Sequence, residues 1–169
     1  MMTIWEFRGR RSLLRFRRAD WDRMTRELGL RGDGRRESGG FLMARRDGDR
    51  RRVVRVLYLD DLDPNCLQGK HIHFDGRAYS RLWDICDAEN LVVVGDAHTH
   101  CGDWAEQSDI DARNPMVAVE GHVALILPRL AMHRIQPADV GVHRYGGSAG
   151  WQSWFGGDAA QRLYVRRLL

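Results

Sequence analysis

Two histidines separated by one residue, His98 and His100, follow the short apolar run Leu91–Val94. Side chains of an extended strand alternate between its two faces, so the two imidazoles are expected on the same side. Asp111 follows after a stretch that reads as a loop, and it comes within reach if the chain turns back. Two imidazoles and one carboxylate, with a position left for water, make up the ligand set of a catalytic zinc site. The segment therefore predicts one catalytic zinc ion.

Two further polar residues suit this chemistry. Ser108 precedes Asp111 by three residues, which is the spacing of an N-cap and the first turn of a helix, where the helix dipole favours an anion. A short helix over Asp109–Val119 would then present both side chains to the metal. Glu37 opens a Glu-Ser-Gly-Gly run before an apolar strand, and its two glycines would let the backbone pack closely beside the site.

The complete pattern, E…H-x-H-x7-S-x2-D, resembles the JAMM (JAB/MPN-domain) metallopeptidases, and the resemblance runs from about Ala19 to about Val142. Members of that family remove ubiquitin or ubiquitin-like modifiers, or process their precursors. The resemblance implies a single JAB/MPN-type domain, cytidine-deaminase-like, with a mixed β-sheet flanked by helices. It also implies a zinc isopeptidase or peptidase that cleaves after the C-terminal glycine of a ubiquitin-like protein. Small stand-alone relatives occur in bacterial conjugation operons, some of them antiviral.

The same resemblance gives each residue a role. His98, His100 and Asp111 are then the zinc ligands. Ser108 helps to stabilise the oxyanion that forms on the scissile carbonyl. Glu37 accepts a proton from the activated water and passes it to the leaving amine, which requires a partly shielded place near the metal. The substrate-binding residues are not identified by the pattern.

Two positions depart from the usual family pattern, because Cys101 and Gln107 stand where the family has proline. Cys101 could lie in the loop, or its thiolate could be a fourth zinc ligand. A site with four protein ligands is structural rather than catalytic. We favour the loop, because adjacent residues rarely both reach one metal with good geometry.

Simpler explanations exist for the same residues. Taken alone, His98 and His100 would be ordinary loop histidines, and Ser108 with Asp111 could be only a helix cap. The complete set, with Glu37, favours a site. The other histidines are weaker candidates: a pair that could line a groove or be exposed (His71 and His73), and three expected to be structural (His122, His133 and His143). The acidic residues near the site could attract an Arg-rich tail or form a solvated loop; they are Asp96, Asp103, Glu106 and Asp109.

Length and composition fit one α/β domain. The chain has 169 residues, of which 43% are hydrophobic and 30% charged, as in globular proteins rather than disordered ones. Three cysteines without a C-x-x-C pair argue against disulfides and for a reducing compartment. No apolar run is long enough to cross a bilayer, so we expect no membrane association and a cytoplasmic protein.

Charge is unevenly distributed along the chain. Residues 1–56 carry 17 Arg against eight acidic residues, whereas residues 57–120 carry 13 acidic residues against four basic ones. The arginines are scattered and follow no aromatic-interleaved motif, so nucleic-acid binding is not favoured. A metal-silent or nucleic-acid-binding scaffold of the same fold remains the alternative function. The oligomeric state is left open.

Periodicity predicts the elements that must position the site. A helix over Ala19–Leu28 ends at Gly29, and a second helix covers Asp75–Ala88. The expected strands are Thr3–Phe7, Ser12–Phe16, Phe41–Ala44, Val53–Leu59, Leu91–Val94, His122–Leu127 and Val140–Tyr145. The chain reads as one domain over 1–169, with a Gly/Trp-rich C-terminal extension at 146–169. Three aromatic residues of this extension form either a partner-binding patch or a closure of the core: Trp151, Trp154 and Phe155.

Overall fold

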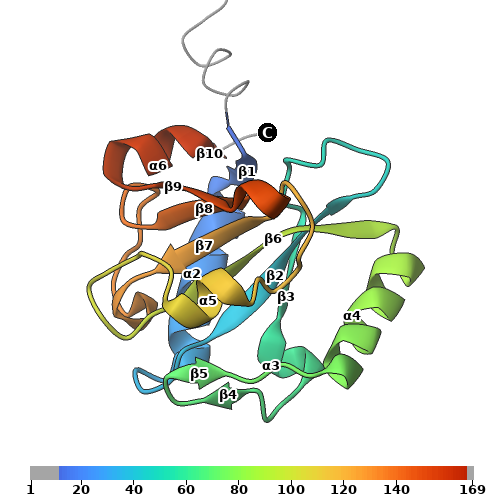
Figure 1. Cartoon of the computed structure of the whole chain (residues 1–169), viewed down its shortest axis with the longest axis horizontal. Coiled ribbons are helices and arrows are strands. Elements are labelled where there is room, and N and C mark those ends of the chain that lie inside the picture. The colour runs from blue at the N-terminus through green and yellow to red at the C-terminus, as the bar shows by residue number, and fades with distance from the viewer. Residues whose placement is uncertain (1–11, 167–169) are drawn as a thin grey trace, which may run out of the picture.

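The computed structural model describes residues 12–166, which form a six-stranded mixed sheet in the order β3-β2-β6-β7-β8-β9 (Figure 1). The strands are β1 (Leu14–Arg17), β2 (Gly39–Arg45), β3 (Arg55–Tyr58), β4 (Leu67–Gln68), β5 (His71–Ile72), β6 (Leu91–Thr99), β7 (Val123–Leu127), β8 (Gly141–Tyr145), β9 (Trp151–Trp154) and β10 (Leu163–Arg166). The helices are α2 (Arg18–Gly32), α3 (Leu59–Leu62), α4 (Gly76–Ala88), α5 (Asp109–Arg113) and α6 (Gly156–Arg162), with short 3₁₀ turns η1 (Arg129–Ala131) and η2 (Gly147–Ala149). The expected α/β class, a mixed sheet flanked by helices, is confirmed.

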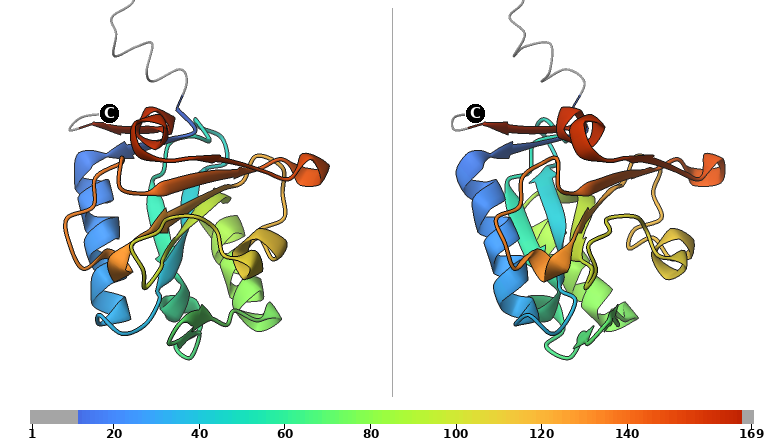
Figure 2. Two further views of the ribbon diagram at one scale, coloured as in Figure 1. Left: turned by 60° about the vertical axis from the view of Figure 1, so that its left-hand side comes forward. Right: turned by 90° about the vertical axis from the view of Figure 1, so that its left-hand side faces the viewer.

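Helices cover the two faces of the sheet unequally. Figure 2 shows α2 on one face and α4 with α5 on the other. The face under α2 packs into one apolar cluster, which includes Trp21, Leu125 and Val142. The other face packs into a second cluster with α3 and α4, which includes Phe41 and Leu82. This second face also carries the side chains of the candidate site.

The strand β6 lies inside the sheet, carries His98 and ends at Thr99, directly before His100. It pairs antiparallel with β2 and parallel with β7, which places Gly39 opposite His98. A Cβ on Gly39 would lie 3.3 Å from the Cβ of His98 and 3.2 Å from the Ala97 carbonyl oxygen. Glycine at 39 therefore permits the close packing that the sequence predicts. Gly40 makes its close approach to β3 instead, since a Cβ there would meet the Leu57 carbonyl oxygen at 3.1 Å.

The first helix is longer than its sequence pattern suggests. The expected end at Gly29 is wrong, because α2 continues to Gly32 and Asp33 takes the left-handed conformation after it. Gly29 is needed for a tertiary contact: a Cβ there would lie 2.7 Å from the carbonyl oxygen of Ala131. Glycine at position 29 therefore allows the η1 turn to pack closely against α2. It does not end the helix.

Both ends of the described chain meet in a separate two-stranded sheet. β1 pairs with β10 in parallel, so Leu14 lies opposite Leu163. Of the segment 146–169, β9 adds the sixth strand to the main sheet beside β8, and α6 follows it. The strand expected at Thr3–Phe7 lies outside the described residues. The searched residues contain no helix long and apolar enough to cross a membrane.

Candidate metal centre

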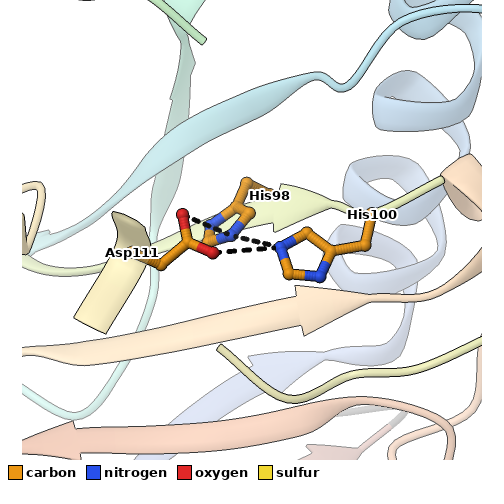
Figure 3. Close-up of side chains that lie close together, drawn as sticks. All are labelled: His98, His100 and Asp111. Atoms are coloured by element: carbon orange, nitrogen blue, oxygen red, sulfur yellow. Dashed lines mark hydrogen bonds and ion pairs between the residues drawn. The ribbon is translucent and has the colours of Figure 1, made fainter. Parts of the chain in front are cut away.

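Three side chains from two elements meet on the open part of the sheet face (Figure 3). His98 projects from the end of β6, His100 follows directly after that strand, and Asp111 projects from α5. The Nε2 atoms of the two histidines are 3.3 Å apart. The carboxylate of Asp111 lies 3.2 Å from Nε2 of His100 and 3.8 Å from Nε2 of His98. These three residues form the group that could hold a metal ion among the residues described.

The separations fit a tetrahedral zinc ion. Zinc binds imidazole nitrogen and carboxylate oxygen at about 2.0–2.2 Å, so its ligand atoms are about 3.3–3.5 Å apart. The observed values bracket that distance, and Nε2 of both histidines faces the shared point. The residues therefore fit the zinc ion that the sequence predicts, with one coordination position left over. The donor set by itself is compatible with other divalent metals.

Electrostatics also favour a positive charge at this point. Burial alone would lower the pKa of His98, but the nearby carboxylates of Asp111 and Asp96 outweigh this effect and raise the pKa to about 10. Burial opposes ionisation of Asp111, yet its hydrogen bond with His100 and the nearby ring of His98 hold its pKa well below the usual range. A proton and a metal cation compete for the same nitrogen, so a centre that attracts one attracts the other.

The short helix α5 is built to present Asp111. Ser108 is its N-cap: the backbone N–H of Asp111 donates to Ser108 Oγ at 3.1 Å, and the backbone N–H of Ser108 donates to Asp111 Oδ2 at 2.9 Å. The Ser108 hydroxyl also donates to Asp111 Oδ2 at 2.6 Å. The expected N-cap is confirmed, but the helix ends at Arg113 rather than at Val119.

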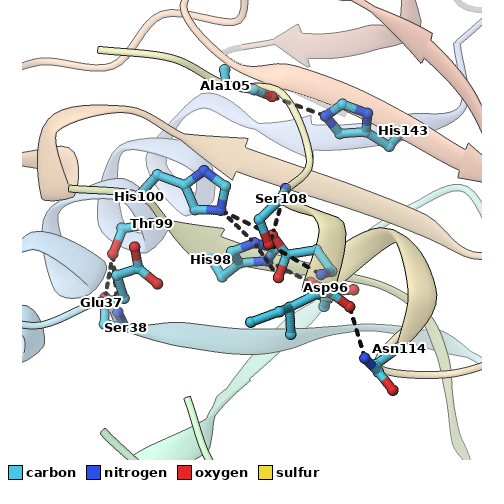
Figure 4. A network of polar contacts seen from close by, with 12 residues as sticks. Glu37, Ser38, Asp96, His98, Thr99, His100, Ala105, Ser108, Asn114 and His143 are labelled. Carbon is cyan, nitrogen blue, oxygen red and sulfur yellow. Dashed lines mark hydrogen bonds and ion pairs between the residues drawn. The ribbon is translucent and has the colours of Figure 1, made fainter. Parts of the chain in front are cut away.

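Glu37 lies two residues before β2, next to the end of β6. The Ser38 N–H donates to Thr99 Oγ1 at 2.9 Å, and the Thr99 N–H donates to the Ser38 carbonyl at 2.9 Å (Figure 4). These bonds fix the segment that carries the Glu37 carboxylate, which lines the same pocket as His98. Partial burial raises the pKa of Glu37, although the positive potential of His100 opposes it. A carboxylate of raised pKa is suited to proton transfer.

Cys101 supports Glu37 and is not part of the ligand group. Its backbone N–H donates to Glu37 Oε1 at 3.3 Å. Partial burial and the nearby Glu37 carboxylate raise the pKa of the Cys101 thiol. The side chain is exposed and lies outside the three-residue ligand group, as expected for a loop position.

Asp96 belongs to the centre, although the sequence suggests a solvated loop residue. The strand β6 continues to Thr99, and Asp96 is 3% exposed within it. Its carboxylate contacts Nδ1 of His98 at 3.2 Å and Nε2 of His122 at 2.7 Å. The sequence signal for this role was the position of Asp96 two residues before His98, because alternation along a strand puts both side chains on one face.

The loop between β6 and α5 is anchored to β8 of the main sheet, and α5 itself is anchored to β9. His143 on β8 donates from Nε2 to the Ala105 carbonyl at 2.9 Å, and its Nδ1 contacts Ser153 Oγ at 2.8 Å (Figure 4). Trp151 donates its indole N–H to the Ala112 carbonyl at 3.0 Å. These aromatic side chains therefore position α5 and its carboxylate.

The three candidate metal ligands open into a pocket of about 860 Å³. One end is polar and contains Glu37 and Ser108 with the ligands. Trp104, 45% exposed, packs its ring 4.2 Å from the ring of His100 at the same end. The rest of the wall is largely apolar and includes Ile72, Phe74, Tyr79, Ile110 and Met116. A pocket of this size accepts an extended peptide segment or a compact apolar group beside the centre.

Comparisons with solved structures show the fold. The chain is similar to a protein from Desulfitobacterium hafniense solved in solution, with a TM-score of 0.65, 20% identity, and 92% of this chain and 94% of that chain covered. It is also similar to a protein from Salinibacter ruber, with a TM-score of 0.59, 14% identity and coverages of 90% and 91%. At these identities the likeness shows the α/β fold alone.

A crystal structure of a JAB1/MPN domain protein from Archaeoglobus fulgidus aligns with a TM-score of 0.48 at 10% identity, covering 90% of this chain and 96% of that chain. Similarity at this score does not assign the chain to that family. No family model matches the sequence. The residues of the centre itself are therefore the basis for assigning its chemistry.

Proposed function

We propose that this protein is a JAMM-type zinc metallopeptidase of the JAB/MPN fold. Its proposed reaction is hydrolysis of the bond after the C-terminal glycine of a ubiquitin-like protein. One observation carries the proposal: the ligand atoms of His98, His100 and Asp111 lie 3.2 to 3.8 Å apart in one pocket, with Glu37 in the same wall. The sequence spacing agrees with this geometry. The proposed pathway is a bacterial ubiquitin-like conjugation system, with deconjugation and precursor processing as its two possible reactions.

The residues around the centre divide the work of hydrolysis. His98, His100 and Asp111 would hold the zinc ion, which would supply Lewis acidity toward water and the scissile carbonyl. Glu37 accepts the proton of the attacking water and delivers it to the leaving amine. The Cys101 N–H holds the Glu37 carboxylate in place for this transfer. The Ser108 hydroxyl turns from Asp111 to the carbonyl oxygen as negative charge develops there.

The pocket suits a chain terminus better than a folded surface. Its walls include Ile110 and Asp111 of α5, the segment 70–74 and Tyr79 of α4. An extended tail can enter between these walls, whereas a globular partner would remain at the rim. The ligands are all retained, and this disfavours the metal-silent scaffold.

The test uses zinc-loaded protein and ubiquitin-like proteins whose C-terminal glycine carries a fluorogenic amide. Glu37→Gln is the matched control, because it keeps the size of the side chain and removes its basicity. We expect release of the fluorophore by wild type and none by the variant while both hold zinc. Equal rates for the two proteins would contradict the role of Glu37 as the base. A wild-type protein that does not bind zinc would contradict the proposal itself.

A further inference from the structure

Asp96 is a carboxylate buried between two imidazoles. Its side chain is 4% exposed, and the His122 side chain that donates to it is 2% exposed. Removing an ionised carboxylate from water is costly unless hydrogen bonds replace its hydration. His122 Nε2 at 2.7 Å and His98 Nδ1 at 3.2 Å provide two such bonds. The ionised carboxylate of Asp96 is therefore stabilised by both histidine rings, and the carboxylate in turn holds the two rings.

The contact with Asp96 selects one tautomer of His98. An ionised carboxylate only accepts hydrogen bonds, so Nδ1 of His98 must carry the hydrogen. In the neutral ring that binds a metal, Nε2 then has the free lone pair, and this atom faces His100 and Asp111. This is the tautomer that a metal requires at Nε2. Asp96 also restrains rotation of the ring.

His100 has no equivalent support among the described residues. Its Nδ1 is buried and has no hydrogen-bond partner there. Its ring is held by packing against Trp104, with centroids 4.2 Å apart. The two candidate ligands at the end of β6 are therefore positioned by different means. One depends on a hydrogen-bonded carboxylate, and the other depends on an aromatic contact.

We propose that Asp96 and His122 are positioning residues of the metal centre, and that together they fix the tautomer and orientation of His98 for metal binding. This inference rests on the proposed metal function of His98. Neither residue belongs to the ligand group. His122 acts through Asp96 by holding the carboxylate that holds the ligand. The pair thus extends the centre from β6 to the residue that precedes β7.

Asp96→Asn gives the first test, with Asp87→Asn as the control. The amide introduced by Asp96→Asn keeps the size of the side chain but presents an N–H to one of its two imidazole neighbours. Asp87 is 74% exposed on α4, so its substitution removes the same charge away from the pocket. We expect zinc affinity, measured by competition with a chromophoric chelator, to fall about 10- to 100-fold in Asp96→Asn and to stay unchanged in the control. Wild-type affinity in Asp96→Asn would overturn the inference.

His122 gives a second test that survives if Asp96→Asn does not fold. In His122→Gln the amide N–H reaches the place of Nε2, whereas His122→Leu fills similar space without a donor. We expect weaker zinc binding and an altered visible spectrum of the Co²⁺-loaded protein for His122→Leu, and values close to wild type for His122→Gln. Equal behaviour of the two variants would overturn the role of His122. Wild type that binds neither metal would instead reject the metal centre, and with it the proposed function.

Discussion

Two His-x-His segments of this protein have the same spacing and opposite surroundings. His71 and His73 are exposed, and His71 lies on a strand of two residues that pairs only with β4 in the described chain. His98 and His100 are 9% and 2% exposed at the end of β6, which pairs on both sides. Both segments line the same pocket. The second has a carboxylate within contact distance, Asp111, directed at its ring nitrogens.

The difference teaches that spacing alone does not make a metal site. Strand alternation places both pairs on one face, but exposed imidazoles stay hydrated and mobile. Burial fixes the ring positions, and a nearby carboxylate supplies the charge that a cation needs. We therefore expect the two segments to respond very differently to the same substitution.

Replacing His98 by Ala has the largest expected effect. It removes a proposed zinc ligand, so we expect zinc binding and the proposed peptidase activity to be lost. Zinc at 100 times its Kd should raise the unfolding free energy of wild type by about 2.7 kcal/mol and that of His98→Ala by nearly nothing. Thermal denaturation with and without zinc measures this. If zinc stabilised His98→Ala as much as wild type, the two His-x-His segments would no longer differ in metal binding.

Glu37→Gln separates chemistry from metal binding at the buried segment. The variant should keep about one zinc per chain, because Glu37 is outside the ligand group. Its kcat should fall about 10²- to 10⁴-fold, since the amide cannot accept the proton. Metal analysis and steady-state kinetics on one preparation supply both numbers. A parallel loss of zinc would place Glu37 among the ligands instead.

Ser108→Ala removes the proposed oxyanion donor. We expect kcat to fall about 10²- to 10³-fold. Loss of the N-cap should also lower the unfolding free energy by about 1 kcal/mol. Ser108→Thr keeps a hydroxyl and should restore much of both. If the Thr and Ala variants are equally slow at unchanged zinc content, the hydroxyl has no catalytic role.

Ala at His71 or His73 has the smallest expected effect. These exposed side chains can touch substrate at the pocket wall, so KM should rise less than about tenfold while kcat and zinc content stay the same. Kinetics against the fluorogenic substrates measure this change. Loss of zinc from either variant would show that the exposed segment also contributes to the metal.

The ligand arrangement was largely predictable from local rules. Alternation along a strand places His98 and His100 together, and the N-cap spacing places Ser108 and Asp111 at a helix start. What the sequence could not supply is the distance between these two elements. That distance depends on the loop held by His143, whose bond to the Ala105 carbonyl spans 38 positions.

The supporting residues were less predictable because burial is hard to infer for polar side chains. The apolar run Leu91–Val94 stops before Asp96, so the strand reads as finished there, although it continues to Thr99. From the sequence, Gly29 is expected to end the helix. In the structure it instead allows a close contact with the backbone of Ala131, far along the chain. In both cases a tertiary partner, absent from the local pattern, decides the structure.

The parallel pairing of β1 with β10 has a consequence for how the chain acquires its structure. Leu14 and Leu163 are partners from opposite ends of the described sequence, and contacts this distant form slowly because a very long loop must close first. During synthesis β1 must wait until β10 has left the ribosome. The six-stranded sheet can form before that moment, since β9 is complete at Trp154. The candidate metal centre is therefore expected to assemble before β1 gains β10 as its partner, when β1 can already form its backbone hydrogen bonds with residues 51–53.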